Sequence, residues 1–205
     1  MKKILILTVV ALGSTSLRAD DSMPPTNMST MPEDAACFQA SLTPAIAIHP
    51  RTTEINGLAL NIWGENPQHS FNLGIVNGST GDSSGFSVGV VNYDDSYVGV
   101  QWGVVNCSKE SFSGWQWGLV NDANGIFNGW QEGVVNISKG TFTGWQDGWV
   151  NVSEEVHGLQ TGIVNYAEDL NGVQIGLANI AVNNGWFDDF PDQLAKGFPL
   201  VNWSF

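Results

Sequence analysis

The chain has 205 residues, about the length of one domain or slightly more, and carries 20 acidic against seven basic residues, a net charge of −13. This balance excludes the basic footprint of a nucleic-acid-binding protein and disfavours charge-driven binding to anionic lipid head groups. Two cysteines are too few for a disulfide scaffold, and no apolar stretch is long enough to span a bilayer as a helix.

Residues 1–19 have the pattern of a secretory signal peptide. Lys2 and Lys3 precede an apolar run over residues 4–13, and small residues lead to a cleavage point before Asp20. Cleavage would leave four basic residues against 20 acidic ones, a net charge of −16. The alternative is a short membrane anchor that stays on the chain. The sequence therefore predicts export, with the outer membrane or the cell surface as the destination.

Residues 20–53 are rich in Pro, Met, Ser, Thr and Asp, which predicts a disordered or loosely packed leader. Its last part, residues 37–49, is more apolar and is expected either to pack on the following domain or to act as a plug. Export would allow Cys37 to form a disulfide with Cys107 and so join the leader to the rest of the chain, although pairing stays open. The three histidines stand in no metal-ligand spacing, so we expect neither a metal nor a cofactor.

Residues 54–205 form a repeat domain built on the unit G-x-Q-x-G-x-x-N. Six clear copies occupy residues 99–106, 114–121, 129–136, 144–151, 158–165 and 172–179. Their closing asparagines are 14 or 15 residues apart, and weaker copies begin at Gly57, Ser70 and Gly85. With a last apolar run over residues 196–205, the pattern predicts about ten strands and an all-β fold.

Apolar and polar residues alternate along each copy, which gives a strand two unequal faces. Between residues 112 and 121 the first face consists of Phe112, Gly114, Gln116, Gly118 and Val120. The second face consists of Ser113, Trp115, Trp117, Leu119 and Asn121. The second face is therefore the one on which large apolar side chains gather.

The turns favour an up-and-down antiparallel meander, which could close into a barrel. Asn124-Gly125, flanked by alternating runs, is a strong hairpin signal. A hairpin there would place Gln116 opposite Gly133 and keep both on the first face. Repeats of 14 and of 15 residues can both keep the first face continuous from strand to strand, provided that the number of turn residues is odd or even as the repeat length requires.

The alternative architecture is a β-solenoid with one coil of 14–15 residues per repeat. Identical positions would then stack, and the repeated Gln and Asn would form amide ladders. So small a coil, however, leaves little room inside for Trp115, Trp130 and Trp145. The partner of Gln116 separates the two folds, since it is Gly133 in a hairpin and Gln131 in a solenoid.

Two resemblances bear on function. The G-x-Q-x-G-x-x-N units, over residues 57–179, resemble a loosely described group of bacterial surface-repeat proteins of unknown function, which implies no activity; this chain is richer in Trp and lacks a lipobox cysteine. The alternating Val201, Trp203 and Phe205 resemble the terminal strand of bacterial outer-membrane β-barrels. That resemblance would place the second face in lipid, where the carboxylates of Glu132 and Asp147, in the middle of their strands, would be costly.

Those carboxylates and the neighbouring indoles form a candidate binding patch, which comprises Trp115, Trp117, Trp130, Glu132, Trp145 and Asp147. The rings could stack on sugars while the carboxylates accept hydrogen bonds. A carboxylate pair would also suit glycoside hydrolysis, but divergence at a variable repeat position explains it more simply, so we expect no enzyme.

Two functions remain open. The first is a non-enzymatic exported surface or outer-membrane protein with a structural role, in contact with a lipid bilayer or a surface partner. The second is a soluble exported module that recognises a glycan or a protein through the Trp/acid patch. The sequence does not predict an oligomeric state.

Overall fold

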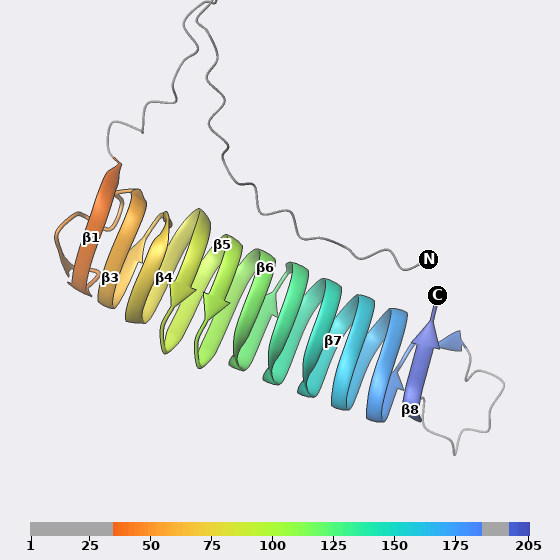
Figure 1. Ribbon diagram of the computed structural model, residues 1–205. Helices are drawn as coiled ribbons and strands as arrows, with labels where there is room; N and C mark the ends of the chain where they lie inside the picture. The colour runs from red at the N-terminus through yellow and green to blue at the C-terminus, as the bar shows by residue number, and fades with distance from the viewer. Residues whose placement is uncertain (1–34, 186–196) are drawn as a thin grey trace, which may run out of the picture. The chain divides into compact units, whose positions relative to one another are not determined.

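Each copy of the repeat makes one circuit around a common axis, so that equivalent residues of consecutive copies lie side by side in parallel strands (Figure 1). This architecture is that of a computed structural model, which describes residues 35–185 and 197–205. The expected signal peptide and residues 20–34 of the expected leader lie outside the described residues.

Eight strands form one sheet in the described part of the chain. They are β1 (Ala36–Thr43), β2 (Ile46–Ala47), β3 (Ile55–Asn66), β4 (His69–Val88), β5 (Val91–Trp102), β6 (Val105–Asn124), β7 (Ile126–Ala181) and β8 (Gly197–Ser204). Their order in the sheet is β2-β1-β3-β4-β5-β6-β7-β8. Strand β7 is 56 residues long because it continues around several coils without a break.

The all-β prediction is confirmed, but the antiparallel meander and its closure into a barrel are wrong; the structure has the alternative, a β-solenoid. Gln116 lies beside Gln131 in the parallel pairing of β6 with β7. Asn124-Gly125 is therefore a corner of a coil and not a hairpin turn. The meander fails physically because it sets each glutamine opposite a glycine, which offers a buried side-chain amide no partner.

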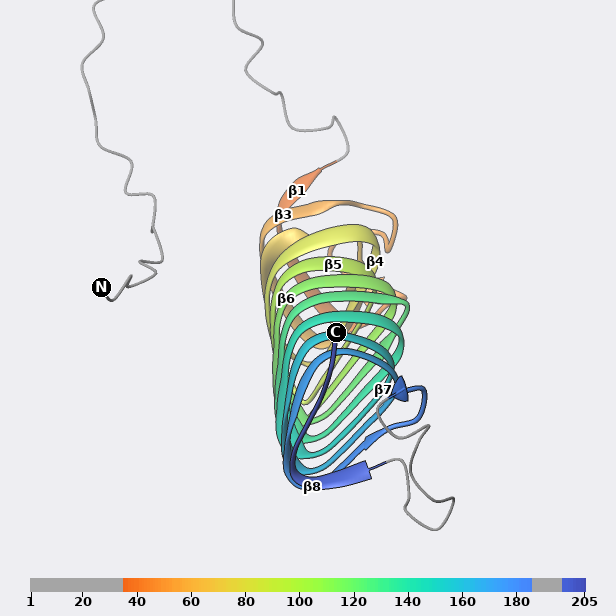
Figure 2. The ribbon, with the colours of Figure 1, turned by 90° about the vertical axis from the view of Figure 1, so that its right-hand side faces the viewer.

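A row of asparagine amides runs through the interior of the coils, which Figure 2 shows as successive loops of similar outline. Asn106 Nδ2 donates to Asn121 Oδ1 at 2.8 Å and to the Trp117 carbonyl at 3.0 Å, both in the next coil. The same pattern links Asn61, Asn77, Asn92, Asn106, Asn121, Asn136, Asn151, Asn165 and Asn179, at 2.8–3.0 Å between amides. In each of these bonds between amides, the acceptor lies in the next coil toward the C-terminus.

A second interior row consists of glutamines, and its donors point the other way. Each Nε2 donates to the Oε1 of the preceding coil at 2.7–3.0 Å, through Gln174, Gln160, Gln146, Gln131, Gln116 and Gln101. Asn202 of β8 donates into one end of the row at 3.2 Å. At the other end Gln101 donates to Asp94 at 2.6 Å, so the carboxyl group of Asp94 terminates the row.

The apolar part of the interior is narrow and largely aromatic. Tyr97, Phe112, Phe127 and Phe142 stack with ring centroids 5.0–5.9 Å apart, and Val156 and Leu170 continue the row. The expected first face thus points inward as far as Gly118, whereas Val120, expected on the same face, is not buried. A corner at residues 118–120 shifts the alternation by one, so Asn121 also points inward, although it was expected on the second face. The tryptophans point outward, which removes the spatial objection to the solenoid.

Glycine is required where neighbouring coils approach most closely. Gly129 has a φ of 140°, and a Cβ placed on it would lie 1.9 Å from the Gly114 carbonyl oxygen. Gly114 stands in the same relation to Gly99. The first glycine of the repeat therefore has both a conformation and a contact that exclude any side chain.

Strands of different geometry close the two ends. Strands β1 and β2 cover the first coil, and Gln39 there bonds to both the amide and the carbonyl of His49. The first strand begins at Ala36, so the strand structure includes part of the segment that was expected to be a leader, which ends before residue 54. Strand β8 runs antiparallel to the last coil of β7, and Asn202 lies beside Gln174.

The bridge between Cys37 and Cys107 that the sequence left open is absent from the structure, in which both cysteines are free. Cys37 is on β1 and Cys107 on β6, with β3, β4 and β5 between them in the sheet. Neighbouring strands are about 4.8 Å apart, whereas a disulfide needs Cα atoms within about 7 Å. Among the residues that the structure describes, no helix is long and apolar enough to cross a membrane.

Replacement of Gly129 by Ala should lower the free energy of unfolding by more than about 3 kcal/mol, because the methyl group meets backbone of the preceding coil. Urea denaturation followed by circular dichroism measures this. Gly81→Ala is the control, since Gly81 also has a positive φ, 61°, but no atom would lie within 4 Å of its Cβ. Equal losses in the two variants would contradict the close-contact explanation.

The carboxyl group of Asp94 should make the fold less stable as the pH rises. Asp94 is fully buried, and desolvation raises its pKa from 3.8 to about 7 despite hydrogen bonds from Gln101 and Ser108. Between these values the folded chain keeps the proton that the unfolded chain loses. Stability from this group is therefore complete below pH 3.8 and lost as the pH rises through 7.

The Asp94→Asn variant tests this dependence, because it keeps an oxygen acceptor for Gln101 without the ionisation. From about pH 4 to about pH 8 the wild type should lose roughly 2–4 kcal/mol relative to the variant. Urea denaturation across this range gives the difference. Parallel stability profiles would show that the carboxyl group does not titrate in this window.

Candidate binding face and groove

The outward side chains on one side of the solenoid form three apolar rows, together called the apolar face. The first row is Leu58, Phe71, Phe86, Val100, Trp115, Trp130, Trp145, Leu159 and Val173. The second is Leu60, Leu73, Val88, Trp102, Trp117, Glu132, Asp147, Thr161 and Ile175. The third is Ile62, Ile75, Val90, Val104, Leu119, Val134, Trp149, Ile163 and Leu177. Many large apolar side chains of the apolar face are exposed, with exposed fractions from 37% at Leu58 to 69% at Leu177.

Another side of each coil is polar. The polar face is defined by the exposed charged residues Asp82, Lys109, Glu110, Lys139, Glu154, Glu168 and Asp169. Lys109 pairs with Asp95 at 2.8 Å and lowers the pKa of that carboxyl group. Apart from Glu132 and Asp147 on the apolar face, and exposed apolar side chains such as Ile126 elsewhere, charged and apolar side chains thus lie on different sides of the coils.

The tryptophans of the first row stack on one another. Trp130 lies between Trp115 and Trp145, with ring centroids 5.2 and 5.0 Å apart and interplanar angles of 12° and 2°. Both faces of the Trp130 ring are therefore covered by neighbouring indoles. Because stacking on a sugar needs a free ring face, this row is better suited to rigidifying the surface than to holding a glycan.

The second row changes from aromatic to acidic along the solenoid. Trp102 and Trp117 meet edge to face, with centroids 5.1 Å apart at 85°, and Glu132 and Asp147 follow in the next two coils. Thr161 donates its hydroxyl to Asp147 Oδ1 at 2.6 Å and accepts from Trp145 Nε1 at 2.8 Å. This chain of hydrogen bonds fixes the Asp147 carboxylate against the surface.

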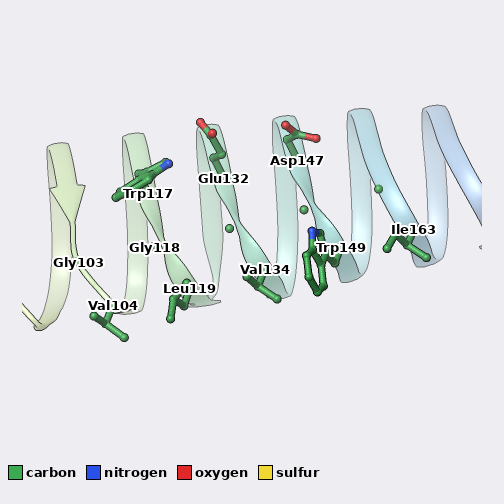
Figure 3. A pocket seen from close by; sticks show the side chains of 13 residues that line it. Gly103, Val104, Trp117, Gly118, Leu119, Glu132, Val134, Asp147, Trp149 and Ile163 are labelled. Carbon is green, nitrogen blue, oxygen red and sulfur yellow. The ribbon is translucent and has the colours of Figure 1, made fainter.

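A groove of about 760 Å³ runs across the coils between the second and third rows. Trp117, Glu132 and Asp147 line one wall, and Leu119, Val134, Trp149 and Ile163 line the other (Figure 3). Between the walls lie the corner glycines Gly103, Gly118, Gly133, Gly148 and Gly162.

The corner glycines make the groove possible. A Cβ on Gly133 would point into the interior, 2.5 Å from the Gly118 carbonyl oxygen and 2.9 Å from Asn121 Nδ2. The asparagine row therefore excludes a side chain at this position, and only bare backbone faces outward. The repeat thus produces a groove floor as a consequence of its interior packing.

The carboxylates of the groove have no basic partner in the part of the chain that the structure describes. Its three basic residues, Arg51, Lys109 and Lys139, pair with Glu65, Asp95 and Asp122 away from the groove. Within residues 35–185 and 197–205, the Glu132 carboxylate receives no hydrogen bond. The groove therefore combines apolar walls with uncompensated negative charge.

All six residues of the expected binding patch lie on the apolar face, but not in one place. Trp117, Glu132 and Asp147 line the groove, whereas Trp115, Trp130 and Trp145 form the adjacent stack. The predicted patch did not include the third row or the glycine floor, which were detectable only by superposing the repeats at a 14–15-residue period. In the described ranges, no group of three or more metal-ligating side chains occurs.

Comparison with known proteins gives no relatives: no protein-family model, no curated protein and no solved structure matches the chain.

Alanine substitution should show that the stacked indoles contribute more to the stability of the fold than the groove indoles do. Trp130→Ala should destabilise the fold by about 2–4 kcal/mol, because it opens a gap in a covered stack. Trp149→Ala should change stability by less than about 0.5 kcal/mol, because Trp149 is 64% exposed. Thermal and urea denaturation measure both. A reversed order would mean that the first row is not the structural one.

Proposed function

We propose that the chain is a non-enzymatic exported protein that acts at the cell surface as a rigid scaffold and binds a protein partner through the apolar face. The observation that carries this proposal is the apolar face itself, which has exposed large apolar side chains in every coil except the one that contains Trp130 and Val134, where they are half-buried. Apolar surfaces of this extent generally mark interaction sites in soluble proteins. The signal-peptide pattern of residues 1–19 supports export.

A protein suits this face better than a lipid bilayer or a glycan does. Glu132 and Asp147 lie in the middle of the face, and each carboxylate would cost on the order of 2–4 kcal/mol in hydrocarbon. The stacked tryptophans have too few free ring surfaces to form a sugar platform. A protein partner can cover apolar rows and supply polar groups opposite the carboxylates.

Site-specific photocrosslinking in the cell that exports the protein tests the proposal. Benzoylphenylalanine in place of Trp149, on the apolar face, should give a covalent adduct with a protein. The same reporter in place of Lys139, on the polar face, is the matched control and should give no such adduct.

Three results would overturn the proposal. An adduct with lipid at position 149 would favour membrane contact, and an adduct with a second copy of this chain would favour self-assembly. Absence of any adduct on the apolar face would show that nothing covers it.

A further inference from the structure

We propose that the groove between the second and third rows binds an extended segment of the partner that carries an Arg or Lys among apolar residues. The basic side chain would lie between the carboxylates of Glu132 and Asp147, and the apolar side chains would follow the groove walls. This inference rests on the proposed function and deepens it by naming the chemistry of the bound segment.

The dimensions of the groove favour an extended chain. Its walls flank a single glycine in each coil, so their Cα atoms are at most about 7 Å apart along the strand. An α-helix with side chains is about 10–12 Å wide and would rest above such a groove. The floor from Gly103 to Gly162 crosses five coils, which is roughly 19 Å and about six extended residues.

The charge of the groove favours a basic residue. Glu132 and Asp147 occupy equivalent positions in adjacent coils, about 4.8 Å apart along the axis. Thr161 holds the Asp147 carboxylate in place, whereas Glu132 is free to turn toward a partner. Two neighbouring carboxylates match a guanidinium or ammonium group, and the groove indoles Trp117 and Trp149 add cation–π attraction.

Other occupants fit this charge less well. A second copy would bring its own Glu132 and Asp147 to the interface, and its described basic residues are already paired elsewhere. A neutral apolar segment would cover both carboxylates without a counter-charge, which is unfavourable. The acidic excess of the whole chain would also accelerate encounter with a basic partner.

Selection from a random heptapeptide display library on the purified protein tests the inference. Enriched peptides should share an Arg or Lys flanked by apolar residues. The Glu132→Gln/Asp147→Asn double variant should bind them about tenfold more weakly by titration calorimetry, because it removes both charges and keeps side-chain size. Counterparts with Gln in place of the basic residue should lose a similar factor on the wild type.

A matched control separates the groove from general attraction. Glu154→Gln/Glu168→Gln removes two exposed charges from adjacent coils of the polar face and should change affinity by less than about twofold. Equal losses in both double variants, or enriched peptides without a basic residue, would overturn the inference. So would an absence of enrichment. If crosslinking from position 149 still captures a protein in any of these cases, the proposed function stands and only the groove chemistry is wrong.

Discussion

The hydrogen bond between stacked side-chain amides is the interaction on which the rest of this fold depends. An asparagine such as Asn121 is fully buried, and its amide is satisfied by Asn106 of the preceding coil and by Asn136 and a backbone carbonyl of the next coil. An unsatisfied buried amide costs about 1–3 kcal/mol, so a shift in register would leave a whole row without partners. The amides thereby select parallel, in-register stacking over every antiparallel pairing of the same strands.

The apolar face follows from this interior. Amide rows, glycines and one column of stacked rings fill the small cross-section of the coil, so large apolar side chains at alternate positions must point outward. The distribution is therefore the reverse of an ordinary globular core, in which apolar residues are inside. The groove has the same origin, since the asparagine row that satisfies the corner carbonyls also excludes side chains at glycines such as Gly133.

Much of this organisation could be predicted from the sequence, and the failures have definite causes. Alternation and spacing were sufficient for strands, repeat length and two unequal faces. They could not choose between meander and solenoid, because Asn124-Gly125 suits a hairpin and a coil corner equally well. Alternation placed Asn121 on the wrong face, because a strict period of two residues does not allow for the corner at residues 118–120, which shifts the period by one. The patch residues share one face, but Trp149 was left out of the patch although it is only two residues from Asp147, because alternation alone does not show that both side chains border one groove at the Gly148 corner.

The two amide rows donate in opposite directions, and this has a consequence for how such a chain can change in length. Aligned amides add their dipoles, so a single row would polarise the solenoid more strongly with every coil. Here each extra coil adds one asparagine dipole in one sense and one glutamine dipole in the other, which largely cancel along the axis. Whole coils can therefore be duplicated or deleted without an accumulating electrostatic penalty, and the span of the surface can be adjusted by gene-level repetition alone.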